Sequence, residues 1–241
     1  MELESPVRRH PPVFNVPPII PWLIGLLAGV HLFYLYGPVS DEAITYYFAF
    51  IPARLDGTLP IGDSFLEQGA RFWSLVTYSF LHADWVHWGF NSIWMLAFGT
   101  PLARRIGAAR FLLLSALGSI GGALAYYLFH PGQIAELIGA SAAVSAQVAG
   151  AIRLIFARPA VAAVAGERQS IGPARALTLA ETFTNRLPLM FIVVWLGLNY
   201  VFGASGVGIP AGEGLVAWEA HLGGFIVGLL LFGLFDRKPN P

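Results

Sequence analysis

Long apolar segments constrain the fold of this chain more than any other feature of its sequence. Several of them reach the roughly 17–25 apolar residues that a helix needs to cross a lipid bilayer. Only 12% of the 241 residues are charged, whereas a soluble domain usually carries about 25%. Much of the apolar surface therefore has to face lipid, and the sequence predicts an all-α membrane protein.

The apolar segments predict one membrane domain of six helices over residues 19–236, with a short cytoplasmic arm (1–18) before it and a cytoplasmic tail (237–241) after it. Turn-forming or charged residues separate the segments, such as His130-Pro131-Gly132 after the third. The first segment lacks a small-residue cleavage site, so we expect a retained helix and not a cleaved signal. The predicted spans are 19–37, 85–103, 111–130, 139–156, 187–204 and 217–235.

The distribution of basic residues orients these helices, because cytoplasmic loops of membrane proteins collect Lys and Arg. With a cytoplasmic N-terminus, only Arg54 and Arg71 lie outside, in a long first outer loop over about 38–84. The sequence therefore predicts that both termini are cytoplasmic and that this loop packs at the membrane interface. The remaining basic residues then lie inside: Arg8, Arg9, Arg104, Arg105, Arg110, Arg153, Arg158, Arg168, Arg175, Arg186, Arg237 and Lys238.

The composition also bears on cofactors and partners. The chain has no cysteine, which excludes disulfides and thiolate metal sites. His82 and His87 are five residues apart and no Glu follows the first, so this is not the His-Glu-x-x-His zinc motif. We expect no metal, no cofactor and no nucleic-acid partner.

Polar residues in the apolar segments fall at similar depths in the predicted membrane. A helix rises about 1.5 Å per residue, which places Ser141 about 18 Å from Arg153 and His221 about 22 Å from the charge at Asp236. By the same measure, Asn91 lies about 20 Å from the inner Arg pair that ends its helix. These groups share one layer below the outer surface, and we expect a water-accessible cavity there that opens to the outside.

Together these residues have the chemistry of an acyl-transfer site. A serine hydroxyl beside an imidazole can form an activated nucleophile, here Ser141 with His221. His87 and Asn91 are spaced i, i+4, share one helix face and can donate hydrogen bonds toward one point. The backbone N–H groups of Ala140 and Ser141, at a helix N-terminus, are further donors for an oxyanion. No Asp or Glu occupies an obvious third position, so a Ser–His dyad is the preferred interpretation.

Three stretches of this sequence resemble the rhomboid intramembrane serine proteases. They are residues 82–91 (His-Ala-Asp-Trp-Val-His-Trp-Gly-Phe-Asn), 139–141 (Gly-Ala-Ser) and 220–224 (Ala-His-Leu-Gly-Gly), the last followed by Gly228. The resemblance covers about 70–235 and implies a six-helix core that cleaves transmembrane segments of other proteins.

The resemblance also implies roles for individual residues. Ser141 is the implied nucleophile and His221 the implied general base, with His87, Asn91 and the Ser141 amide at the oxyanion site. Small residues let the sixth helix approach the fourth closely. These helix-packing positions are Gly139, Gly224 and Gly228.

Four positions depart from the usual pattern of that family. Ala142 replaces the glycine that commonly follows the serine, and Ser145 stands where some members carry an aromatic that packs on the histidine. Ser74 follows Trp73 where an Arg is usual, and Ala103 replaces an acid after the second helix's glycine. None of the four removes a group that the implied chemistry needs.

Other interpretations of the polar residues remain open. A serine in a membrane helix is usually a packing residue that bonds to its own helix, and a lone intramembrane histidine can serve as a proton relay. The chain could also be an inactive rhomboid-like factor for membrane-protein binding or quality control, or a small transporter. The preferred hypothesis is an intramembrane endopeptidase whose partners are transmembrane substrates and the lipid bilayer, in a bacterial inner membrane.

Overall fold

The computed structural model describes residues 16–157, 175–205 and 217–236. Most of the predicted N-terminal arm and the whole predicted tail lie outside these ranges. The described residues form helices and connections, with one isolated bridge between Phe50 and Leu137 and no strand. The prediction of an all-α protein is therefore confirmed.

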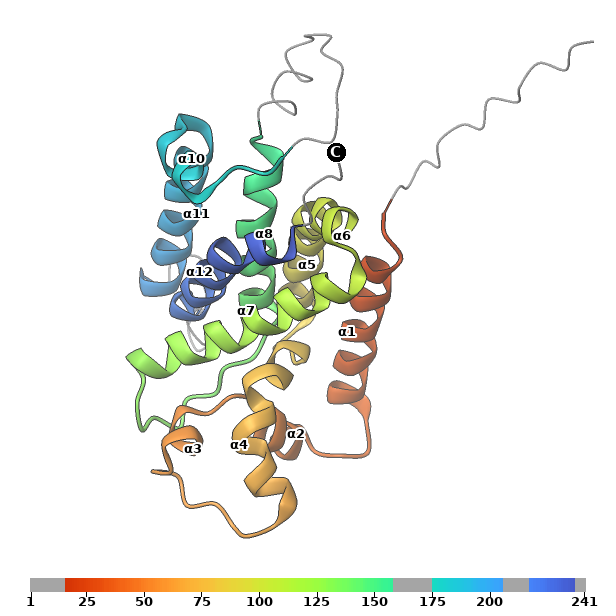
Figure 1. Cartoon of the computed structure of the whole chain (residues 1–241). Coiled ribbons are helices and arrows are strands. Elements are labelled where there is room, and N and C mark those ends of the chain that lie inside the picture. The colour runs from red at the N-terminus through yellow and green to blue at the C-terminus, as the bar shows by residue number, and fades with distance from the viewer. Residues whose placement is uncertain (1–15, 158–174, 206–216, 237–241) are drawn as a thin grey trace, which may run out of the picture.

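Every predicted span is helical, and the bounds of the helices differ from the predicted bounds by at most three residues (Figure 1). The first predicted span is α1 (Ile19–Tyr36), and the third, fourth, fifth and sixth are α7 (Ala108–Phe129), α8 (Ser141–Ile155), α11 (Arg186–Ser205) and α12 (Trp218–Phe235). The second is divided into α5 (Trp85–Trp94), the π-helical turn η2 (Met95–Gly99) and α6 (Thr100–Ile106).

Four helices are long and apolar enough to cross a membrane by length and composition: α1, α7, α11 and α12. The other two predicted spans do not meet that standard, for different physical reasons. α8 has only 15 residues. Pro101 lies in the first turn of α6, directly after the π-helical turn; because proline has no N–H and its ring crowds the preceding turn, it interrupts a regular α-helical ladder.

α8 is the central helix of the bundle. Its residues from Ala142 to Arg153 are all buried, and α12 and α7 are its most extensive helical neighbours (Figure 1). α1 and α11 lie at the two edges of the view and bury only 17% and 22% of their apolar windows. A helix buried on all sides needs small side chains, and the alanines and glycine of α8 supply them.

α12 packs on α8 through Gly224 and Gly228. A Cβ built at Gly224 would overlap the backbone of Ala142, and one at Gly228 would overlap the backbone of Ala146. The two helices are thus in backbone contact, which small residues permit in membrane bundles.

The predicted first outer loop is folded. It contains α2 (Asp41–Phe48), α3 (Pro52–Asp56), α4 (Phe65–Thr77) and the 3₁₀ turn η1 (Tyr78–Phe80). Arg71 donates two hydrogen bonds to the Leu55 carbonyl at 3.0 and 2.7 Å, and Trp73 Nε1 donates to the Tyr47 carbonyl at 2.7 Å. Arg54 is fully buried and donates to the Ala49 carbonyl at 3.2 Å, and this burial lowers the pKa of its guanidinium. These side-chain to backbone bonds hold the loop helices together.

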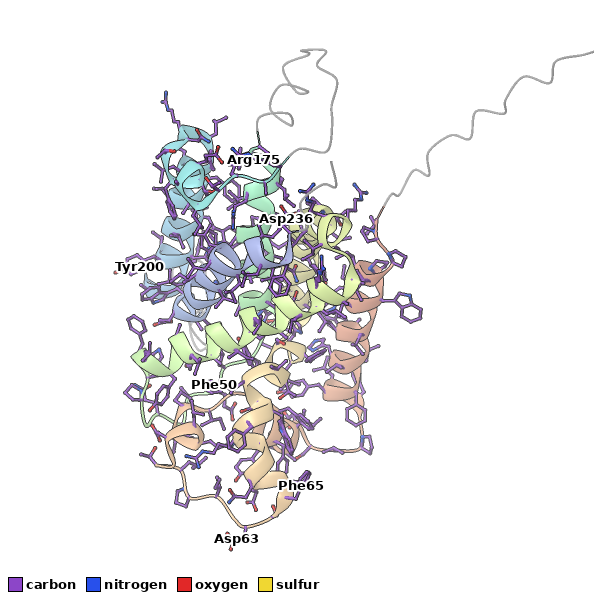
Figure 2. The ribbon with its side chains drawn as sticks, viewed as in Figure 1. Phe50, Asp63, Phe65, Arg175, Tyr200 and Asp236 are labelled. Carbon is purple, nitrogen blue, oxygen red and sulfur yellow. The ribbon has the colours of Figure 1, made fainter. Side chains whose placement is uncertain are left out.

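Arg175 lies at the opposite end of the molecule from Asp63 of the predicted outer loop (Figure 2). Arg105 forms an ion pair with Asp236 at 2.5 Å. Arg153 donates to the carbonyls of Leu177 and Leu229 at 2.8 and 3.0 Å. The end of α12 is therefore tied to neighbouring elements by arginines.

The backbone contact of α12 with α8 generates a stability prediction. We expect Gly224→Ala to lower the free energy of unfolding by about 1–3 kcal/mol, because the added methyl overlaps Ala142. Gly197→Ala is the matched control, since a Cβ there meets nothing within 4 Å; we expect it to be neutral or to stabilise by up to about 1 kcal/mol. Denaturant unfolding in detergent measures both variants, and equal stabilities would contradict the packing assignment.

Candidate active site

Ser141 is the first residue of α8, directly after a sharp change of chain direction. Gly139 has φ +116°, a conformation that favours glycine. Its N–H donates to the Tyr78 carbonyl at 3.0 Å, and the Tyr78 hydroxyl donates to the Ser119 carbonyl at 2.8 Å. Gly139 thus fixes the entry of the chain into α8, and Ser141 is held at its start.

The N-terminus of α8 has no side-chain cap. The first bond of its ladder runs from the Val144 N–H to the Ala140 carbonyl at 2.9 Å. In the described part of the chain, no hydrogen bond engages the amides of Ala140 or Ser141. Uncapped amides and the helix dipole make this end of α8 attractive to negative charge.

His221 lies in the first turn of α12, beside the start of α8. Gly122 of α7 contacts both Ala142 and the carbonyl of Ala220. Ala142 follows Ser141 in the chain, and Ala220 precedes His221. Ala142 and Ala220 are fully buried, whereas Ser141 and His221 are each partly exposed. The fold therefore places the two predicted catalytic residues at the starts of two adjacent helices, although no hydrogen bond joins their side chains within the described residues. Such bonds are often loose in the absence of substrate.

His87 extends from α5 toward the same place. Asp84 caps this helix by accepting the His87 backbone N–H at 2.7 Å. The ring Nδ1 of His87 accepts from the Ala83 N–H at 3.4 Å, which assigns the ring proton to Nε2. A Cβ built at Gly139 would lie 2.6 Å from His87 Nε2 and 3.8 Å from Ser141 Oγ. The Nε2–H donor and the serine hydroxyl thus flank one small space.

Asn91 is buried one helical turn from His87. Its Nδ2 donates one hydrogen bond to the His87 carbonyl at 3.0 Å. An amide nitrogen carries two hydrogens, so one N–H remains available to another acceptor.

The structure reveals a polar partner of the His221 ring that the sequence reasoning missed. Oδ1 of Asn199, on α11, is hydrogen-bonded to Nδ1 of His221. The signal in the sequence is an amide side chain within an apolar span, and an amide oxygen can accept from an imidazole N–H as a carboxylate does. Glu219, the nearest acid in sequence, instead contacts Nε2 of His130 at 3.3 Å.

The positions that depart from the family pattern have ordinary packing roles. Ser145 donates to the Ser141 carbonyl at 2.8 Å, within its own helix. Ala103 is almost fully buried in the main hydrophobic core, and Ser74 is buried in α4.

His82 lies beside His87, in the connection between η1 and α5. The two ring centroids are 5.1 Å apart, and His82 is fully buried. Burial lowers the pKa of His82, so this imidazole is neutral at neutral pH and adds no charge beside His87. Within the described residues, no group of three or more His, Asp or Glu is placed to hold a metal ion.

The helical bundle and its polar cluster define an integral membrane protein with serine and histidine gathered at the start of a buried helix. The family model described as the Rhomboid domain matches residues 69–238. The chain therefore belongs to the rhomboid family, as its resemblance predicted.

Curated relatives agree with this assignment. Rhomboid protease GlpG of Serratia proteamaculans is 27% identical over 165 residues, which are 68% of this chain and 49% of that protein. Rhomboid protease GlpG of Yersinia pestis is 26% identical with the same coverage. Rhomboid protease GluP of Bacillus subtilis is 35% identical over 78 residues, 32% of this chain and 15% of that protein. The chain spans about half the length of the GlpG relatives it matches.

The position of Gly139 leads to a second prediction. We expect Gly139→Ala to slow modification of Ser141 by a fluorophosphonate at least about tenfold, because the new methyl displaces the His87 ring. Gly132→Ala is the control: Gly132 also has positive φ (+69°), but a Cβ there meets only Thr58, at 3.6 Å. Equal labelling rates for the two variants would show that Gly139 has no particular role in the site.

Proposed function

We propose that this protein is an intramembrane serine endopeptidase that hydrolyses peptide bonds in or near transmembrane segments of membrane proteins. The observation that carries the proposal is Ser141 at the uncapped N-terminus of α8, beside His221 and facing the same space as His87 Nε2. Membership of the rhomboid family and the names of the relatives support it.

In this proposal Ser141 is the nucleophile and His221 the general base. Ser141 Oγ attacks the substrate carbonyl carbon while its proton passes to His221, and the imidazolium then protonates the departing amine. Water subsequently attacks the acyl-enzyme, giving up its proton to His221, and the freed Oγ regains a proton. The partial exposure of Ser141 and His221 supports access of water to this site.

The negative oxygen of the tetrahedral intermediate needs hydrogen-bond donors already in place. We assign this role to His87 Nε2–H, the remaining N–H of Asn91, and the backbone amides of Ala140 and Ser141. Removal of a single such donor typically costs about 10²–10³-fold in kcat. The dipole of α8 favours the same charge.

The topology belongs to the same proposal. We infer six membrane-spanning helices over 19–236, with α5–η2–α6 and the short α8 as the two that length alone does not identify. The arm (1–18) and tail (237–241) are assigned to the cytoplasm of a bacterial cell and the bundle to its inner membrane. Arg175 and Asp63 lie at opposite ends of the molecule (Figure 2), as they must if one segment is inside and the other outside.

The alternatives fit the site less well. An inactive rhomboid-like binding or quality-control factor has no need to keep both Ser141 and His221 beside uncapped amides. A transporter would be expected to place carboxylates in the middle of its spans, and the apolar windows of α1 and α11 hold none.

The proposed chemistry is tested by cleavage of a transmembrane substrate in proteoliposomes. We expect Ser141→Ala and His221→Ala each to reduce cleavage to background, because the nucleophile or its base is lost. Ser145→Ala, one helical turn away, is the control and should retain most of the activity. Cleavage that survives Ser141→Ala would exclude Ser141 as nucleophile.

The proposed orientation can be tested with single cysteines, since the chain has none of its own. In intact spheroplasts, a membrane-impermeant maleimide should label Asp63→Cys, in the outer loop. It should label Thr184→Cys, at the end of α10 (Leu179–Thr184), only after permeabilisation. The reverse pattern would invert the topology, with both termini outside.

A further inference from the structure

Asn199 is an amide side chain on an otherwise apolar helix. Its neighbours Leu198 and Tyr200 are about half exposed on the surface of α11, whereas Asn199 is only partly exposed. An amide in an apolar setting is costly unless its hydrogen bonds are satisfied. A specific partner is therefore required, and the structure provides two.

The two hydrogen bonds determine which way the amide points. Nδ2 of Asn199 donates to the Trp195 carbonyl at 2.7 Å, within α11. The reversed orientation would place Oδ1 against that carbonyl, where two acceptors would face one another. Oδ1 must therefore be the atom that faces Nδ1 of His221.

This orientation in turn determines where the imidazole carries its proton. Because Oδ1 can only accept, Nδ1 of His221 is the donor, and Nε2 is left with a free lone pair. A base that is to take the Ser141 proton needs this tautomer. His87 has the opposite arrangement, with Nδ1 accepting from the Ala83 N–H and Nε2 left to donate.

In the described part of the chain, no other side chain is hydrogen-bonded to the His221 ring. Ser145 bonds to its own helix, and Glu219 contacts His130. Tyr200 follows Asn199, and Trp218 is the first residue of α12. Their ring centroids are 5.3 Å apart, and this contact holds α11 against the start of α12. The position of Asn199 relative to His221 thus depends on how α11 packs on α12.

We propose that Asn199 is a positioning residue that completes a Ser141–His221–Asn199 arrangement, and that it acts by fixing the tautomer and orientation of His221. The inference rests on the proposed function of Ser141 and His221. As His221 takes the serine proton on Nε2, Nδ1–H continues to donate to Oδ1, so the imidazolium keeps a partner throughout. Because Asn199 belongs to α11, a displacement of α11 from α12 removes that partner.

The decisive variant is Asn199→Leu, which has similar volume but no acceptor. We expect kcat for a transmembrane substrate to fall about 10- to 100-fold, the range typical for loss of the residue that orients a metal-binding histidine, with KM changed by less than about twofold. Asn199→Asp keeps an oxygen acceptor and should recover most of the loss. Leu198→Ala, on the exposed side of the same helix, is the matched control and should leave kcat unchanged.

A second measurement does not depend on catalysis. In protein with ¹⁵N-labelled histidine, the His221 signals, identified by their absence in His221→Ala, should report protonation at Nδ1 in the wild type. In Asn199→Leu they should report a mixture of tautomers or protonation at Nε2. An unchanged tautomer, or a kcat within about twofold of wild type, would overturn the proposal.

The two proposals fail in different ways. If wild-type protein cleaves and Ser141→Ala does not, but Asn199→Leu is fully active, only the role of Asn199 is wrong. If the wild type cleaves nothing under any condition tested, the proposed function is wrong, and the tautomer measurement still decides whether Asn199 orients the imidazole.

Discussion

α12 lies so close to α8 that a Cβ at Gly224 or Gly228 would overlap backbone atoms of the facing helix, and the candidate site depends on this contact. Ser141 begins α8 and His221 lies in the first turn of α12, so the distance between the helices sets the distance between a hydroxyl and an imidazole. In lipid, packing of this kind and interhelical hydrogen bonds hold helices together, since burial of apolar surface gives little advantage there.

Ala142 illustrates how tightly this region is filled. It is fully buried and contacts Gly122 of α7 on one side and Gly224 of α12 on another. The alanine that replaces a more usual glycine is therefore accommodated by glycines on both neighbouring helices. Helices α7, α8 and α12 meet at Ala142, and Ser141 directly precedes it.

Neighbouring groups determine whether each imidazole of the site offers a hydrogen-bond donor or an acceptor. The Ala83 amide leaves His87 with a donor at Nε2, and the Asn199 carbonyl oxygen leaves His221 with an acceptor at Nε2. The Nε2 atoms of the two imidazoles thus have opposite hydrogen-bonding character, and each is determined by a single hydrogen bond to Nδ1. In a medium of low dielectric constant, such bonds are stronger and misplaced protons more costly than in water.

The sequence by itself determined the helical class and the approximate bounds of the helices, and it pointed to Ser141, His221, His87 and Asn91 as candidate site residues. Apolar length and helical rise are local properties, and they remain valid whatever the helices pack against. Only the tertiary structure decided that Asn199 meets His221, and that His87 and His221 carry their protons on different nitrogens. These features depend on how α11 packs beside α12 and how the chain turns at Ala83, and contacts between segments distant in sequence have no signature in local periodicity.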